Sequence, residues 1–186
     1  MKFPKLSLIN KGQKGFTLIE LMIAIAIGGL IASSVTMTIF QIVDSSGRTS
    51  NHMTAIRQVQ SAGYWVSRDA QMAQQAPAIV EDSGELQSIT LDWTDWDGNV
   101  YQVIYTLEDM SVGSLKELQR VEDKDTGTGT ITETTIVAEF IDPDPANTSC
   151  EYTDGKLTFT VTVQVGAGSA AQIEARMYEV IPRPGS

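Results

Sequence analysis

The chain has 186 residues, of which 42% are apolar, and a formal net charge of −10. This length suffices for one modest domain with an appendage. The acidic excess disfavours direct nucleic acid binding, because phosphates would be repelled. With one histidine and one cysteine, a single chain can build neither a zinc cage nor a Cys-His nucleophile with a second histidine, and no cofactor is expected.

Residues 16–40 form an apolar run in which Glu20 is the only formal charge. As a helix the run spans about 37 Å, enough to cross a hydrocarbon core about 30 Å thick. Basic residues precede the run and the chain beyond it is acidic, so the positive-inside rule places the N-terminus in the cytoplasm and the C-terminal part outside. The basic residues are Lys2, Lys5, Lys11 and Lys14.

A secretory signal peptide is the competing interpretation of this N-terminus. Such a signal has an apolar stretch of about 7 to 15 residues, followed by a small-residue cleavage site. Here the apolar run is longer, and Gly15 lies before it. Cleavage after Gly15 would therefore leave the membrane helix on the mature protein.

The stretch KGFTLIE, residues 14–20, followed by an apolar helix, resembles the N-terminal signature of type IV pilins and type II secretion pseudopilins. The resemblance covers about residues 1–44. It implies that a prepilin peptidase cuts between Gly15 and Phe16 and methylates the new Phe16 amine, and that Glu20 serves assembly. The implied partners are other pilin or pseudopilin subunits and a pilus assembly platform. The implied location is the inner membrane and then a surface or periplasmic filament.

The physical chemistry of a membrane helix fits this role for Glu20. A carboxylate in such a helix is costly and is usually paired. Cleavage after Gly15 would create a partner, the Phe16 amine of a neighbouring subunit, and a wrong axial register would leave both charges unpaired. The alternative is that Glu20 lies near the cytoplasmic interface and extends its carboxylate to water.

Small residues recur at a spacing of four along the same helix. Such residues let helices approach closely in lipid or in a filament core, although they are common in any membrane helix. These candidate assembly residues are Ala24, Gly28 and Ala32.

Residues 45–76 are predicted to form an amphipathic second half of the helix. A kink or short break is expected at 45–51, with Ser50 or Asn51 as a new cap, and Pro77 is expected to end the helix. The apolar stripe would pack on a globular head. The stripe comprises Ile56, Val59, Ala62, Gly63, Val66, Ala70 and Ala73.

Residues 77–186 are predicted to form a β-rich head. Strict alternation in KLTFTVTVQV, residues 156–165, indicates a half-buried strand. Further strands are expected at 88–93, 99–107, 134–141 and 172–181, with loops at 123–130 and 142–149. The predicted fold class is α+β, with a long N-terminal helix packed on an antiparallel sheet, as the resemblance to pilins also implies.

The stretch DWTDWDGN is the best candidate for a metal site. Asp92, Asp95, Asp97 and Asn99 offer oxygen ligands of the kind that calcium prefers. The spacing does not fit an EF-hand, because Gly98 comes too early and no glutamate closes the loop. Asp97-Gly98 favours a hairpin turn, and no metal site is predicted.

The single cysteine and histidine carry no predicted chemistry. Cys150 cannot form an internal disulfide, so it is expected to be buried or to be a free thiol. His52 is expected at the surface.

Our interpretation is a structural subunit, not an enzyme, that is cut by a prepilin peptidase and assembled into a filament through its N-terminal helix. It resembles a minor pilin or minor pseudopilin more than a major subunit. Many major subunits have a proline in the first helix and a C-terminal loop closed by a disulfide, whereas here residues 16–76 contain no proline and the lone Cys150 cannot close such a loop. The alternative is an uncleaved, single-pass anchored domain that binds a ligand or senses outside the membrane.

Overall fold

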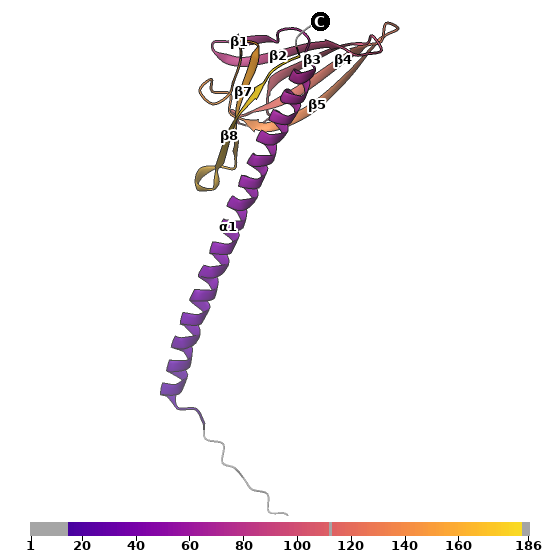
Figure 1. The fold of residues 1–186 in the computed structure, drawn as a ribbon. Helices are drawn as coiled ribbons and strands as arrows, with labels where there is room; N and C mark the ends of the chain where they lie inside the picture. Colours follow the sequence, from indigo (N-terminus) through magenta and orange to yellow (C-terminus); the bar gives the residue numbers. More distant parts are fainter. Residues whose placement is uncertain (1–14, 112, 184–186) are drawn as a thin grey trace, which may run out of the picture. The chain divides into compact units, whose positions relative to one another are not determined.

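The computed structural model describes residues 15–111 and 113–183. The predicted leader, residues 1–15, therefore lies outside the described residues except for Gly15. The chain divides into two compact units, residues 1–44 and 45–186, which we describe separately. The helix α1 (Leu18–Met72) contributes to both units, and all of the strands belong to the second (Figure 1).

The helix α1 is continuous through residues 45–51, so the predicted break is wrong. Hydroxyl groups here turn back to the helix backbone: Thr49 donates to the Ser45 carbonyl at 2.9 Å and Thr54 donates to the Ser50 carbonyl at 3.0 Å. Asn51 does not cap a new helix, because its Nδ2 donates to the Ala170 carbonyl oxygen at 3.0 Å. The polar residues in this segment therefore serve contacts other than a helix end.

The helix ends at Met72, before the predicted stop at Pro77. Gln74 explains the early end, because its backbone N–H donates to the Asp92 carbonyl at 3.0 Å. Its side-chain amide also exchanges hydrogen bonds with the backbone of Thr94 at 3.0 and 3.3 Å. Pairing with the end of a strand thus replaces the last helical turn.

Eight strands form one antiparallel sheet in the order β1-β2-β3-β4-β5-β7-β6, and β8 pairs with the other side of β7. β1 and β2 also contact β6, so the sheet curls on itself. The strands are β1 (Ala78–Asp82), β2 (Glu85–Thr94), β3 (Val100–Asp109), β4 (Lys116–Asp125), β5 (Thr130–Ile141), β6 (Ser149–Thr153), β7 (Lys156–Val165) and β8 (Gln172–Val180), with a 3-10 turn η1 (Gly168–Ala170) before β8.

The core lies between the second half of α1 and the curled sheet. Small helix residues such as Ala55, Ala62 and Ala70 are fully buried, which lets the sheet approach the helix backbone. The larger core side chains come from the sheet and include Tyr105 and Phe159. The predicted α+β fold, with a long helix packed on an antiparallel sheet, is confirmed.

The five predicted strands overlap β2, β3, β5, β7 and β8. The predicted loop at 123–130 is present but shorter, at 126–129, because β4 extends to Asp125 and β5 begins at Thr130. β4 was not expected as a strand, since Arg120 and Glu122 interrupt the apolar alternation that Leu118 begins. β1 and β6 are only five residues long and give little pattern to recognise.

Candidate functional site

The N-terminal end of α1 is closed by Thr17 and Glu20. The Thr17 backbone N–H and hydroxyl both donate to Glu20 Oε2 at 2.9 Å, and the Glu20 backbone N–H donates to Thr17 Oγ1 at 3.3 Å. This reciprocal arrangement is a capping box, in which two N–H groups that lack helical acceptors are satisfied. This cap was not predicted, although Thr-x-x-Glu before an apolar run is its usual signature.

Gly15 and Phe16 precede this cap and lie in the open. Phe16 is 90% exposed. Among the described residues, a Cβ atom added to Gly15 would meet no atom within 4 Å.

The small residues of the first unit show the same property. A Cβ atom at Gly28 would also meet no atom within 4 Å, and Ala24 and Ala32 are exposed. Their spacing places Ala24, Gly28 and Ala32 along one face of the helix. Nothing in the described chain packs on this face, so it is open to another helix or to lipid.

Four hydroxyl side chains in the apolar run are satisfied within the helix. Each donates to the carbonyl oxygen four residues earlier, at 2.8 to 2.9 Å, so none needs water as a partner. The large apolar side chains of the run are exposed to at least 53%. Such a surface requires lipid or protein to cover it. The hydroxyl residues are Ser33, Ser34, Thr36 and Thr38.

By length and composition, α1 is the one described helix that could cross a membrane. Its most apolar window has a mean hydropathy of 2.2 and none of that window is buried. A core helix of a water-soluble protein would be mostly buried, so this apolar segment fits membrane anchoring.

The acidic stretch of the calcium hypothesis forms the turn between β2 and β3, as the hairpin interpretation predicts. Asp95 Oδ1 accepts the backbone N–H groups of Asp97 and Asn99 at 2.9 Å, and its Oδ2 accepts Asn99 Nδ2 at 2.8 Å. Gly98 has φ of 81°, as expected in a hairpin loop that ends with a left-handed residue. Asp92 instead accepts Gln102 Nε2 on the next strand at 3.0 Å. The side-chain hydrogen bond from Asn99, together with those from backbone N–H groups of the turn, lowers the pKa of Asp95 despite desolvation, which acts to raise it.

The side chains of Asp92, Asp95 and Asn99 are therefore engaged in hydrogen bonds within the hairpin. Across residues 15–111 and 113–183, no group of three or more histidine, cysteine, aspartate or glutamate side chains is arranged to hold a metal ion.

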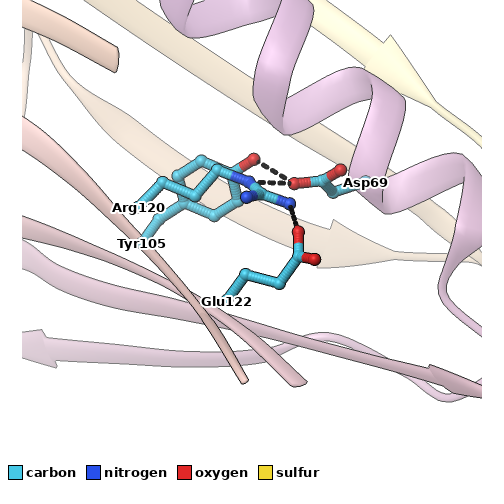
Figure 2. Close-up of polar contacts among 4 residues, drawn as sticks. All are labelled: Asp69, Tyr105, Arg120 and Glu122. Atoms are coloured by element: carbon cyan, nitrogen blue, oxygen red, sulfur yellow. Dashed lines mark hydrogen bonds and ion pairs between the residues drawn. The ribbon is translucent and has the colours of Figure 1, made fainter. Parts of the chain in front are cut away.

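A buried polar cluster joins α1 to the sheet (Figure 2). Tyr105 and Arg120 both donate to Asp69 Oδ2 at 2.6 Å, and Arg120 also bonds Glu122. The Arg120 guanidinium lies 5.0 Å from the ring centroid of Trp65. Asp69 was not among the predicted residues, yet an acidic residue on the apolar stripe of an amphipathic helix is a signal that could have identified it.

The electrostatics of the cluster favour structure over catalysis. Burial and the neighbouring Asp69 carboxylate raise the pKa of Tyr105 far above its usual range. Burial acts to lower the pKa of Arg120, but its hydrogen bonds to Asp69 and Glu122 outweigh this effect and raise it. Tyr105 thus stays neutral and Arg120 stays charged, so neither supplies a proton near neutral pH.

The surroundings of Cys150 and His52 do not favour a nucleophilic role for either residue. Cys150 is buried in β6, in agreement with one of the two expectations, and burial together with Glu81 and Glu151 raises the pKa of its thiol to about 12. The thiolate required of a nucleophile is therefore scarce. His52 is exposed, as expected, and its Nδ1 lies 3.1 Å from Glu174 Oε1.

The similarity to known proteins lies in the N-terminal residues of the chain. Residues 10–36 match the family model of the prokaryotic N-terminal methylation motif. The chain carries the N-terminal signature of type IV pilins and pseudopilins. No match was found among curated proteins or among solved structures.

The pilin-type motif has consequences for the rest of the chain. It supports a processed, pilin-like subunit rather than an enzyme, and it implies cleavage by a prepilin peptidase and assembly with other pilin subunits. The match includes Gly15, Phe16 and Glu20 together with the small residues Ala24, Gly28 and Ala32. Residues 37–186 are not part of the match.

Proposed function

We propose that this protein is a structural subunit, without enzymatic activity, of a type IV pilus or a type II secretion pseudopilus. Residues 1–15 form the leader that a prepilin peptidase removes, and residues 16–44 form the membrane segment that later enters the filament core. Residues 45–76 carry this segment into the head, residues 77–186. The match of residues 10–36 to the methylation motif is the observation on which the proposal depends.

The geometry of Gly15 and Phe16 supports this proposal. A membrane-embedded peptidase needs an accessible bond with little side-chain bulk beside it. Phe16 is exposed, and the described fold does not require glycine at position 15. The only formal charge in the apolar run, Glu20, stands four residues after Phe16, where it can meet the amine of a neighbouring subunit.

Within this family we assign the chain to the minor subunits. Many major subunits carry a proline in the first helix and a disulfide-closed C-terminal loop. This chain has no proline between Phe16 and Ala76, and its one cysteine, Cys150, is buried. The subunit would be inserted with its head outside the inner membrane and then drawn into a filament at the surface or in the periplasm.

The test is processing in cells that contain a prepilin peptidase. We expect mature protein that begins at N-methylated Phe16, and accumulation of the uncut chain for Gly15→Val, because a branched side chain crowds the scissile bond. Mass spectrometry of the N-terminus measures both. An uncut wild-type chain beside another prepilin that the same peptidase processes would instead support an anchored, unprocessed domain that binds a ligand or acts as a sensor.

A further inference from the structure

An open groove lies between the second half of α1 and the strand β8, with a volume of about 450 Å³. Among the described residues, β8 pairs only with β7, so β8 forms an edge of the sheet and one border of the groove. We call this the α1–β8 groove. Its principal side chains are Tyr64, Arg68 and Gln71 from the helix and Arg176 and Tyr178 from the strand.

Two arginines line this groove in a chain of net charge −10. Two lysines of the sheet have carboxylate partners: Lys116 pairs with Asp109 and Lys156 pairs with Glu179. The ion pairs formed among residues 15–111 and 113–183 include neither Arg68 nor Arg176. The groove is therefore a local concentration of positive charge on an acidic protein.

Aromatic side chains hold these arginines in place. The Arg68 guanidinium lies 5.1 Å from the ring centroid of Trp65, a cation–π contact, and Tyr64 meets the same ring edge to face at 5.8 Å. Arg176 lies beside the Tyr178 hydroxyl, which donates to the Val59 carbonyl at 3.1 Å. Anchoring of this kind lowers the entropy that each arginine would lose on binding an anion.

The edge of β8 offers a second kind of recognition. The strand has nine residues, and Pro182 comes only after its end. Because Tyr178 faces the helix, the alternation of a strand places Ile173 and Met177 on the opposite face, where they are 61% and 63% exposed. A long edge with an exposed apolar face and unpaired backbone groups is a template for a further strand.

We propose that the α1–β8 groove binds an extended, acidic segment of another protein chain. The segment adds to β8 as a strand, so its carboxylates, on alternate residues, face Arg68 and Arg176 while its apolar side chains extend the face of Ile173 and Met177. All of these residues lie in the second unit, residues 45–186, so the inference is independent of how the N-terminus is processed.

The test uses the full-length chain in detergent micelles and fluorescent nine-residue peptides, which match β8 in length. The probe alternates glutamate with valine. A second peptide has glutamine for each glutamate, and a third carries N-methyl groups on alternate backbone amides so that it cannot extend a sheet. Fluorescence anisotropy measures each affinity.

We expect the glutamate peptide to bind and the N-methylated peptide not to bind. The affinity of the glutamine peptide should be lower than that of the glutamate peptide by about tenfold or more. The affinity of the glutamate peptide should fall as salt rises toward 1 M, where screening reaches about 3 Å. Equal affinities for the glutamate and glutamine peptides would overturn the charge recognition. Equal affinity for the N-methylated peptide would overturn strand addition.

Variants of the chain locate the site. The double variant Arg68→Glu with Arg176→Glu should lower the affinity for the glutamate peptide about tenfold or more. The double variant Arg68→Gln with Arg176→Gln should lower this affinity to a smaller degree. Arg57→Glu is the control for either single variant, Arg68→Glu or Arg176→Glu, because it changes the net charge by the same amount. Arg57 is an exposed arginine of the same helix that lines a different groove, beside β5. An equal loss for Arg57→Glu would show that only net charge matters and would refute the site.

Discussion

Asp69 and Arg120 form an ion pair, with 2.6 Å between Oδ2 and Nε, in which the side chains are only 2% and 5% exposed. One partner lies on α1 and the other on β4, so this pair fixes the helix on the sheet through a polar contact inside an apolar core. The Tyr105 hydroxyl completes the shell around Asp69. No buried side-chain nitrogen or oxygen among the described residues lacks a hydrogen-bond partner.

Removing one member of this pair should be strongly destabilising. Asp69→Ala leaves the Arg120 guanidinium buried without its main partner, and such a loss typically costs about 3–5 kcal/mol of unfolding free energy. Replacing both, as in Asp69→Leu with Arg120→Met, should cost less, since the one charge that loses its partner, Glu122, is partly exposed to water. Urea unfolding followed by circular dichroism measures these differences. A double variant less stable than Asp69→Ala would contradict the account.

Gly63 should tolerate no side chain, because β8 approaches the helix there. An added Cβ atom would lie 2.0 Å from Tyr178 Cζ. Gly63→Ala must displace that ring, and overpacking of this kind costs about 1–3 kcal/mol. Gly47→Ala is the control in the same helix, since its Cβ atom would meet nothing within 4 Å. Loss of stability for Gly63→Ala and none for Gly47→Ala, measured by thermal unfolding, is the expected result.

Cys150 should make stability depend on alkaline pH. Its thiol has a pKa of about 12 in the folded chain against 9.0 in the reference state. The unfolded chain therefore loses this proton first, and the stabilisation that the buried thiol provides is present below about pH 9 and is lost as the pH rises toward about 12. Cys150→Ala should lack this component. Iodoacetamide should label the native thiol slowly at pH 8, and rapid labelling of the folded chain would contradict the burial.

Calcium should leave the head unchanged. Ligand binding to the native state raises the midpoint of unfolding, and the Asp95 carboxylate is already occupied by the N–H groups of its own turn. Millimolar calcium should therefore shift no midpoint. Asp95→Ala should lower the midpoint to the same degree with and without calcium, because it removes acceptors from the turn. A calcium-dependent rise that Asp95→Ala abolishes would establish a metal site.

Glu20→Gln should separate the charge of this residue from its role in the helix cap. Glutamine also serves in a capping box, so the cap with Thr17 persists while the charge is lost. Membrane insertion and cleavage should remain intact, and incorporation into filaments should fall about tenfold or more, because a neighbouring Phe16 amine loses its partner. Glu20→Asp should be intermediate, since it keeps the charge but has a shorter reach.

The measurement is the ratio of sheared filament to membrane-pool subunit, with processing checked in the same samples. Thr17→Val is the matched control, because it removes a cap partner and keeps the Glu20 charge. Incorporation of Glu20→Gln at the wild-type ratio would contradict the charge-pairing account.

Much of the fold could be predicted where apolar residues follow one period. In β7, Leu157, Phe159 and Val161 alternate with threonines, and all three are buried as the pattern indicates. The stripe from Val59 to Ala73 was likewise visible. Prediction failed for β4, where the residues facing the helix include Arg120 and Glu122. The burial of Arg120 depends on Asp69, a partner 51 residues away that no local pattern reveals.

The candidate site was predictable to a different extent. Gly15, Phe16 and Glu20 were recognised because the motif is contiguous in sequence. The Thr17–Glu20 cap was not predicted, although its two residues stand at the spacing of a capping box and the signal is equally local. The α1–β8 groove could not be predicted, because Arg68 and Arg176 come together only when β8 pairs with β7 and packs on the helix.

The Thr17–Glu20 cap also bears on the dipole of the helix. The first N–H groups of α1 give its N-terminus a partial positive charge, and Glu20, in the first turn, offsets it. Cleavage after Gly15 would add a protonated amine at this same end, one residue before Thr17. The Glu20 carboxylate would then face two positive charges of its own subunit, the partial charge of the helix end and the Phe16 amine. Cleavage would therefore convert a neutralised helix end into one that attracts the carboxylate of a neighbouring subunit.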